Sequence, residues 1–319
     1  MIGNPKVECS ITSWYSKFEK DSLESTILCL PNDVINYIEN DTTIVLPVEA
    51  INPSENNTEW VDGSAVDDDE SEDEKTRPTF PEFSKKIQEA IDFYDAVFIK
   101  TNWRTPSDAI WVAPTKTLKC TTLEEVYLFL KSSDRVSDDI SAIRNLNDDD
   151  NDVPLESCLV IKQWRDINPG NEFRCLVINK QLIGISQRDL SQYHKYMETE
   201  KYNIQTDITS FFNEKIKNKF DLNTYTFDVI RYKKDKVKII DFGLIDEGTV
   251  KKTLFTFDEL DKIENPPELR FIGEEMGIQP NTSNHFCAPQ EVREYLTASA
   301  NDSVIDFLRT EVQNQRIDD

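Results

Sequence analysis

Two aspartates interrupt the apolar strands of a predicted β-hairpin, and this feature constrains the fold most. Residues 225–243 read YTFDVIRYKKDKVKIIDFG, two apolar runs on either side of a lysine-rich turn. If Lys234 and Asp235 form the turn, paired residue numbers sum to 469, so Asp228 faces Asp241. Their Cβ atoms would then lie roughly 4.5–5.5 Å apart, and two like charges at that separation destabilise a sheet unless a cation lies near them. A Mg²⁺ ion carrying nucleotide phosphates would supply that charge.

The same register pairs residue 230 with 239 and residue 232 with 237. Lys-Asp is not a favoured two-residue turn, so a register shifted by one residue, with both aspartates exposed at strand ends, is the alternative. Asp-Phe-Gly at 241–243 suggests a protein kinase. The chain contains neither the glycine-rich loop GxGxxG nor a His-Arg-Asp segment, and these absences exclude that class.

Composition limits the kind of protein further. The chain has 319 residues, of which 38% are hydrophobic, enough for one large or two ordinary folded domains. Its net charge of −24 disfavours nucleic acid and anionic membranes as partners. We find no apolar run of about 18 residues that could span a membrane and no apolar segment of a secretory signal. Six scattered cysteines without a C-x-x-C pair are typical of a reducing compartment, so we expect a cytoplasmic protein, acting as a monomer.

The order of strands and helices favours the α+β class, because the two alternate without a regular β-α repeat. We expect an N-terminal lobe at 1–158 with a disordered acidic insertion at about 52–79, a C-terminal lobe at 159–290, and a tail at 291–319 with a short amphipathic helix. Strands are predicted at 25–31, 42–48, 96–100, 108–113, 158–164 and 172–189, with 158–164 and 172–189 forming a pair. Helices are predicted at 32–41, 80–94, 122–133 and between about 189 and 219, and a loop at 145–154.

Basic residues gather at strand positions of this acidic chain. Lys162 lies inside an apolar strand, where an unpaired charge is costly to bury, so we expect it to meet an anion. Lys100, Arg104, Lys116, Arg174 and Arg188 lie within or beside the other strands. Together the six predict a phosphate site, although ion pairs with surface acids are the alternative for any one of them.

The strand end at 161–164 could also contact a nucleotide. Its main chain could bind an adenine edge, Trp164 offers an aromatic surface, and Glu172 could accept hydrogen bonds from ribose hydroxyls. A core position for Trp164 and a surface position for Glu172 are the alternatives.

The chain order of these parts resembles the ATP-grasp fold, in which two lobes hold ATP between β-sheets. More specifically, the sequence resembles the cell division cycle protein 123 family from residue 13 to about 257. The segments that carry this resemblance are SWY at 13–15, FPEF at 80–83, PSDAIWVA at 106–113, CLVIKQW at 158–164, GNEFRCLV at 170–177, LIGISQRD at 182–189, TFDVIR at 226–231 and KIIDFG at 238–243.

The resemblance implies an ATP- and Mg²⁺-binding assembly chaperone that binds the gamma subunit of translation initiation factor 2 and promotes its joining with the alpha and beta subunits. It implies a phosphate-covering loop at 101–111 and Mg²⁺ ligands at Asp228 and Asp241. The implied nucleotide-binding residues are Lys100, Arg104, Trp111, Ala113, Lys116, Ile161, Lys162, Gln163, Trp164, Glu172, Arg174, Arg188, Asp228 and Asp241.

Two departures from the ATP-grasp pattern bear on chemistry. The segment 101–111 has no glycine, and Gly243 stands where a third metal ligand, an asparagine, is common. Two other functions therefore stay open: an ATP-grasp ligase that joins a carboxylate to an amine, and a non-enzymatic adaptor with a vestigial ATP site. In the tail, Val304, Phe307, Leu308 and Val312 form an apolar stripe that suggests a partner contact.

Overall fold

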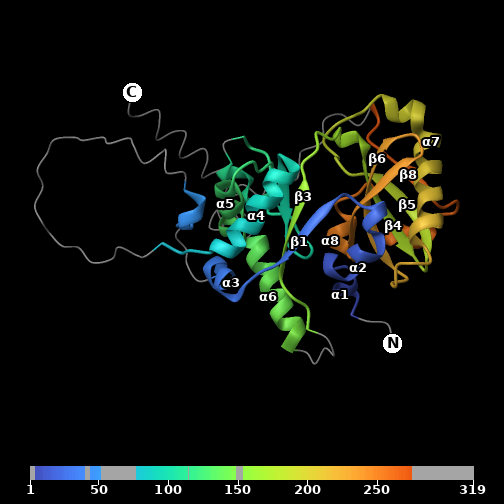
Figure 1. Cartoon of the computed structure of the whole chain (residues 1–319). Coiled ribbons are helices and arrows are strands. Elements are labelled where there is room, and N and C mark those ends of the chain that lie inside the picture. The colour runs from blue at the N-terminus through green and yellow to red at the C-terminus, as the bar shows by residue number, and fades with distance from the viewer. Residues whose placement is uncertain (1–3, 40–43, 52–76, 114, 149–153, 275–319) are drawn as a thin grey trace, which may run out of the picture. The chain divides into compact units, whose positions relative to one another are not determined.

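A computed structural model describes residues 4–39, 44–51, 77–113, 115–148 and 154–274, which all belong to one unit of the chain (Figure 1). They form two β-sheets flanked by helices, which confirms the α+β class. The predicted acidic insertion lies almost wholly outside the described residues, and so does the whole tail with its apolar stripe. Within the described ranges, no helix is both long and apolar enough to cross a bilayer.

The first sheet is three-stranded and antiparallel, in the order β1 (Ser25–Cys29), β3 (Cys158–Gln163), β2 (Val97–Lys100). Its central strand is buried on both faces, as expected of a continuous apolar run. Leu159 and Ile161 point into one hydrophobic core, and Cys158 and Val160 into another. The expected lobe boundary between residues 158 and 159 therefore falls at the start of a strand that both cores share.

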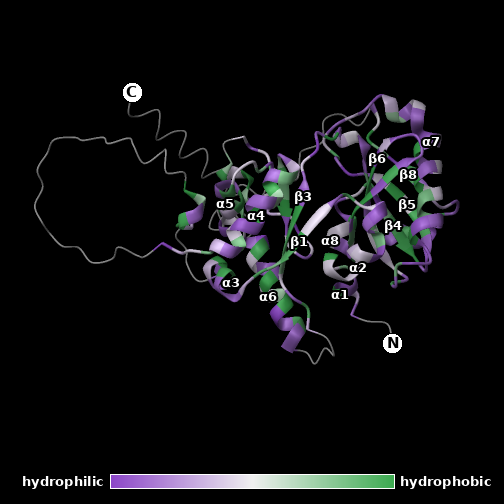
Figure 2. Cartoon of the chain, in the orientation of Figure 1, coloured by the Kyte–Doolittle hydropathy of each residue, from purple (hydrophilic) through white to green (hydrophobic). Residues whose placement is uncertain are grey.

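Four helices contribute most of the other residues of the core that Leu159 and Ile161 enter. Figure 1 shows these helices beside the first sheet. They are α3 (Asn32–Glu39), α4 (Pro81–Tyr94), α5 (Leu123–Ser132) and α6 (Asp134–Asp148). Thr122 caps α5, because its hydroxyl accepts from the Glu125 amide while the Glu125 carboxylate accepts from the Thr122 amide. Figure 2 shows hydrophobic residues concentrated in the strands and on one side of the helices, which is the pattern of sheets covered by amphipathic helices.

The second sheet has five strands in the order β7-β6-β4-β5-β8, with only β8 parallel to its neighbour. The strands are β4 (Glu172–Ile178), β5 (Gln181–Gln187), β6 (Tyr225–Lys233), β7 (Lys236–Gly243) and β8 (Glu268–Arg270). Helix α7 (Tyr196–Phe211), which continues as a π-turn at Phe212–Ile216, packs on this sheet, and α8 (Glu247–Val250) follows β7. Short 3₁₀ turns occupy Glu19–Asp21, Val48–Ala50, Ser107–Val112, Pro169–Asn171 and Phe257–Lys262.

The N-terminal helices pack in the core of the second sheet, which Cys158 and Val160 of β3 also enter. Helix α1 (Pro5–Glu8) precedes α2 (Ile11–Phe18), which places Trp14 and Phe18 against Phe242 of β7, with ring centroids 5.1 and 5.3 Å apart. The start of the chain thus stabilises the hairpin that carries the two aspartates.

The hairpin register is confirmed where it matters most. Lys234 and Asp235 form the turn, Asp235 adopts a left-handed φ of 60°, and Asp228 pairs with Asp241. The predicted pairs 230–239 and 232–237 are wrong, because an irregularity after Asp228 shifts the register and Ile230 pairs with Lys238 instead.

Four other predictions need correction. The described part of 42–48 is not a strand. Residues 108–112 of the strand expected at 108–113 lie in a 3₁₀ helix, whose Asp108 is held by Ser133 and the Arg135 amide. Residues 145–148, expected in a loop, end α6. The strand at 158–164 pairs with β1 and β2, and 172–189 forms its own hairpin, β4–β5.

Candidate functional site

A cavity of about 570 Å³ is lined by strands of the second sheet and by residues in or near the first sheet. Its volume is in the usual range of small-molecule sites. Strands β4, β6 and β7 form one wall, while α6, the segment 103–105 and the residues after α8 contribute to the rest. Its charged lining residues are Lys6, Arg104, Arg135, Asp139, Glu172, Arg174, Arg188, Asp228, Asp241, Asp246 and Lys252.

Asp228 is held by two arginines from neighbouring positions of the sheet. Arg174, its cross-strand partner on β4, donates from Nε and a terminal nitrogen to the two carboxylate oxygens, both at 2.7 Å. Arg188 Nε lies 3.4 Å from the same carboxylate. Burial opposes ionisation here, but the two arginines outweigh it and lower the pKa of Asp228 below its usual value. The bidentate geometry is the strong form of such a pair.

Asp241 is in a different environment, although it faces Asp228. Lys100 Nζ lies 2.5 Å from its Oδ2, whereas its buried Oδ1 accepts no hydrogen bond from any described residue. Burial raises the pKa of Asp241 despite the nearby Lys100 and Lys162. This carboxylate therefore keeps one oxygen available for a further donor or cation.

Lys162 is fully buried beside this pair. Its Nζ donates to the Ile240 carbonyl oxygen at 2.9 Å, and burial together with Lys100 lowers its pKa to about 7. The sequence predicted an anion here. The structure gives Lys162 a carbonyl oxygen, with Asp241 as the nearby charge that favours its protonated form.

The protein's own side chains thus supply the positive charge that facing carboxylates need. Arg174 bonds to both oxygens of Asp228, so Mg²⁺ bound by both aspartates would share the Asp228 carboxylate with this arginine or displace it. Asp241 Oδ1 has no hydrogen-bond donor in the part of the chain that the structure describes, and one carboxylate with phosphate oxygens is a usual Mg²⁺ environment. No cluster of three or more histidine, cysteine, aspartate or glutamate side chains that could hold a metal occurs among the described residues.

Gly243 lines the same wall and pairs with Thr226 across the hairpin. A Cβ atom at position 243 would lie 2.9 Å from Thr226 Oγ1, so any side chain there would displace the threonine. Gly243, at the position where an asparagine is common, therefore leaves the space that the Thr226 side chain occupies across the hairpin.

Asp139 of α6 fixes the start of the predicted phosphate-covering segment. Its carboxylate accepts from the Thr101 hydroxyl, from the backbone amides of Trp103 and Arg104, and from Arg104 Nε at 2.6 Å. Asp139 is only 1% exposed, and Trp103 is further held by the Lys6 carbonyl oxygen, to which its indole N–H donates. The segment is anchored here, and Trp103, Arg104 and Thr105 line the cavity.

Several residues expected around the nucleotide do not line the cavity. Ile161 is in the first core, and the Trp164 amide already donates to the Ala96 carbonyl oxygen at 2.8 Å, so it is not free to bind an adenine edge. Trp164 packs against Phe98, which does line the cavity, at 6.4 Å between ring centroids. The remaining residues outside the lining are Lys100, Trp111, Ala113, Lys116, Lys162 and Gln163. Lys100 and Lys162 nevertheless act on it through Asp241 and the Ile240 carbonyl oxygen.

Glu172 does line the cavity, where burial raises its pKa although Arg188 acts in the opposite direction. Sequence reasoning missed five other charged lining residues, which are Lys6, Arg135, Asp139, Asp246 and Lys252. Arg135 lies in α6, a helix signalled only by the spacing of Val136, Ile140 and Ile143 in a polar stretch. Nothing in the sequence around Lys252 marks it.

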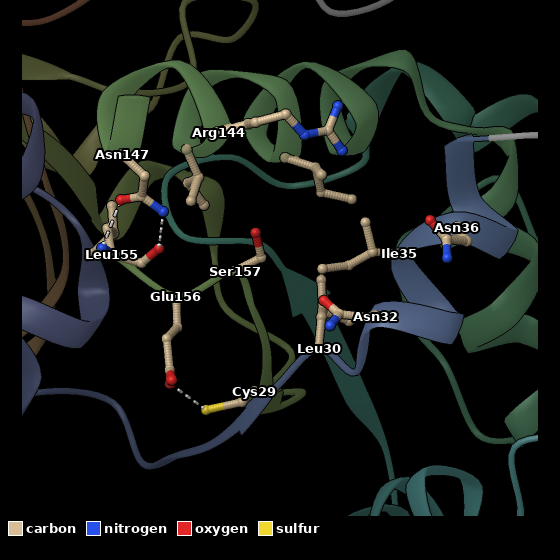
Figure 3. Close-up of a pocket in the computed structure, with 12 residues that line it drawn as sticks. Cys29, Leu30, Asn32, Ile35, Asn36, Arg144, Asn147, Leu155, Glu156 and Ser157 are labelled. Carbon is tan, nitrogen blue, oxygen red and sulfur yellow. Dashed lines mark hydrogen bonds between the residues drawn. The ribbon is translucent and has the colours of Figure 1, made fainter. Parts of the chain in front are cut away.

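A second cavity, of about 560 Å³, lies in the first lobe between α3 and α6 (Figure 3). Figure 3 shows the Asn147 side chain bonded to the backbone of Leu155 and the Cys29 thiol directed at the Glu156 carboxylate. Its arginine, Arg144, is paired with Glu39. Among the described residues, the lining of this cavity therefore contains no cation that is left without an ion-pair partner.

Comparison with known proteins shows similarity over most of the chain. The D123 family model matches residues 14–296. A Xenopus laevis protein named translation initiation factor eIF2 assembly protein is 36% identical over 95% of each chain. Cell division cycle protein 123 of Yarrowia lipolytica is 34% identical over 75% of this chain and 63% of its own.

Among solved structures, Cdc123 from Schizosaccharomyces pombe aligns with a TM-score of 0.67 and 30% identity, covering 86% of this chain and 99% of its own. The similarity thus extends from sequence to fold, and the residues that the family model matches include every segment that lines the charged cavity from Phe98 onward. The family resemblance seen in the sequence is confirmed: the chain belongs to the D123 family.

Proposed function

We propose that this chain is an assembly factor for translation initiation factor 2 and that it binds ATP in the charged cavity. The observation that carries the first part is the 36% identity, over 95% of both chains, to a protein named for the assembly of that factor. The second part is supported by the chemistry of the cavity.

A polyphosphate fits this cavity better than a neutral ligand does. Arg174 and Arg188 are held in fixed positions by Asp228, so their remaining N–H groups are preorganised for phosphate oxygens. The available oxygen of Asp241 suits a Mg²⁺ ion that is also coordinated by those phosphates. In this proposal Asp241 is the primary metal ligand, and Asp228 contributes only if Arg174 moves to the nucleotide.

The finer points of the proposal concern the partner. The gamma subunit is the expected binding partner, and the chain acts as a cytoplasmic monomer. A net charge of −24 suits a partner surface with basic patches, since complementary charge raises the rate of association.

The test is reconstitution. Purified alpha, beta and gamma subunits are mixed with the chain, with and without ATP and Mg²⁺, and heterotrimer is measured by native mass spectrometry. Asp241→Asn should lower both ATP affinity, measured by calorimetry, and the yield of heterotrimer. The control Lys251→Gln changes an exposed lysine outside the cavity lining and should alter neither. Full assembly activity in a variant that no longer binds ATP would refute the coupling of the two.

The same reaction separates the ligase alternative. Steady release of ADP together with a covalent product of a carboxylate and an amine would favour a ligase. Stoichiometric ATP binding without turnover favours the assembly factor.

A further inference from the structure

Arg135 and Lys252 are cations of the cavity without a carboxylate partner. Arg135 comes from the first turn of α6 in the first lobe, and Lys252 from the turn after α8 in the second. Among the residues that the structure describes, neither forms an ion pair. Arg135 donates from one terminal nitrogen to the Ser107 hydroxyl at 2.8 Å, but its buried Nε has no acceptor.

Four of the five carboxylates that line the cavity are engaged by other groups, and the fifth, Glu172, forms no ion pair with either cation. Asp139 binds Arg104, Asp228 binds Arg174, and Asp241 binds Lys100. Asp246 caps α8 by accepting from the Thr249 amide. No described carboxylate therefore forms an ion pair with Arg135 or Lys252, and Asp108, Asp139 and Asp246 offset only part of their charge from a distance.

The two side chains also repel each other and their neighbours. Burial first, and then Arg135, Arg174 and Arg188, lower the pKa of Lys252, against the opposing effect of Asp246. Burial and Arg104 likewise lower the pKa of Arg135, although Asp108 and Asp139 act in the opposite direction. Several like charges around one space favour a ligand with more than one negative charge.

We propose that Arg135 and Lys252 bind the terminal phosphate of a nucleoside triphosphate and thereby distinguish it from a diphosphate. This inference rests on the proposed nucleotide binding. Arg174 and Arg188, anchored on Asp228, are left for the inner phosphates that a diphosphate also has. The terminal phosphate adds negative charge that balances the two unpaired cations, Arg135 of α6 and Lys252 after α8.

The experiment is a calorimetric titration of the full chain with ATP and with ADP, each in the presence of Mg²⁺. Arg135→Gln and Lys252→Gln should each weaken ATP binding by roughly tenfold to a hundredfold, the effect of removing one charged hydrogen-bonding partner. ADP binding should change much less. The double variant should bind ATP no more tightly than ADP.

Two matched controls change the same charges outside the cavity lining. Arg144→Gln alters an exposed arginine of the same helix as Arg135, and Lys251→Gln alters the exposed neighbour of Lys252. Both should leave ATP and ADP affinities unchanged, and circular dichroism checks that each variant is folded.

The outcomes separate this inference from the function on which it rests. Equal losses of ATP and ADP affinity, or unchanged ATP affinity in folded variants, would overturn the assignment of the terminal phosphate while leaving nucleotide binding intact. If the unaltered chain binds neither nucleotide, the proposed ATP function fails and this inference fails with it.

Discussion

Two arginines line one cavity in opposite electrostatic situations. Arg174 makes two 2.7 Å hydrogen bonds to Asp228, and its side chain is 13% exposed. The Arg135 side chain donates to a single hydroxyl, that of Ser107, and leaves a buried Nε without an acceptor among the described residues. Arg174 belongs to a structural ion pair that shapes the site, whereas Arg135 is a cation whose counter-charge is supplied by a ligand.

The difference shows how an acidic protein can hold a polyanion. Its paired cations are costly to separate and therefore rigid, and its unpaired cations supply the attraction. Mutations should divide in the same way: changes that break an ion pair should reduce stability, whatever their effect on affinity, and changes in the unpaired set should reduce affinity with little effect on stability.

The largest effect is expected from Asp228→Ala. The change leaves Arg174 buried without its partner, and breaking such a pair costs about 3–5 kcal/mol of the free energy of unfolding. Urea denaturation at pH 7 measures it. The double variant Asp228→Leu, Arg174→Met removes both charges and should recover most of the loss; a double variant no more stable than the single one would contradict this role of the pair.

The pH dependence of the Asp228 contribution follows from its lowered pKa. Because the folded value lies below the unfolded one, the stabilisation is present above the unfolded pKa and is lost as the pH falls through the folded pKa. The Asp228→Ala variant should therefore lose less stability than the unaltered chain does on acidification.

The next effect concerns Lys162, which is buried with a pKa of about 7. Between that value and its unfolded pKa of about 10.4, the unfolded chain binds the extra proton, so this residue makes stability rise with pH. The slope approaches about 1.4 kcal/mol per pH unit. Lys162→Met should remove this rise, measured as the difference in unfolding free energy between the two proteins from pH 7 to 9. An identical pH dependence in both proteins would show that Lys162 is charged when folded.

A smaller effect is expected from Asp139→Asn. The amide can still accept one hydrogen bond but cannot replace a carboxylate that serves the backbone of 103–104 and the Arg104 side chain. We expect a loss of about 1–3 kcal/mol, as for a buried group left partly unsatisfied, with faster amide hydrogen exchange at 101–104. Unchanged exchange there would mean that other contacts hold the segment.

The sequence predicted the parts of the site that local pattern determines. The alternation of β6 and β7 and the position of the turn gave the pairing of Asp228 with Asp241, and this pairing is found. The register failed beyond it, because the bulge after Asp228 depends on packing against other strands, which no short-range signal encodes.

The side chains that supply positive charge to Asp228 and Asp241 could not be predicted from the sequence, for a related reason. Arg174 is 54 residues from Asp228 in the chain, and Lys100 is 141 residues from Asp241, so only the assembled sheets reveal these pairs. Two facing carboxylates indicate that a cation lies near them. The sequence suggests Mg²⁺ as that cation, whereas the structure shows lysine and arginine side chains beside the carboxylates. Arg135 was missed with its helix, since α6 is largely polar and its apolar positions are few.

The smallest effect separates the two kinds of cation most directly. Arg135→Gln and Lys252→Gln together should change the free energy of unfolding by no more than about 0.5 kcal/mol, because no ion pair among the described residues is broken and the repulsion from Arg174 and Arg188 is relieved. Urea denaturation of the ligand-free double variant beside the Asp228→Ala variant gives the contrast. A loss of several kcal/mol would place Arg135 and Lys252 among the structural charges, and affinity data on these variants would then no longer separate binding from folding.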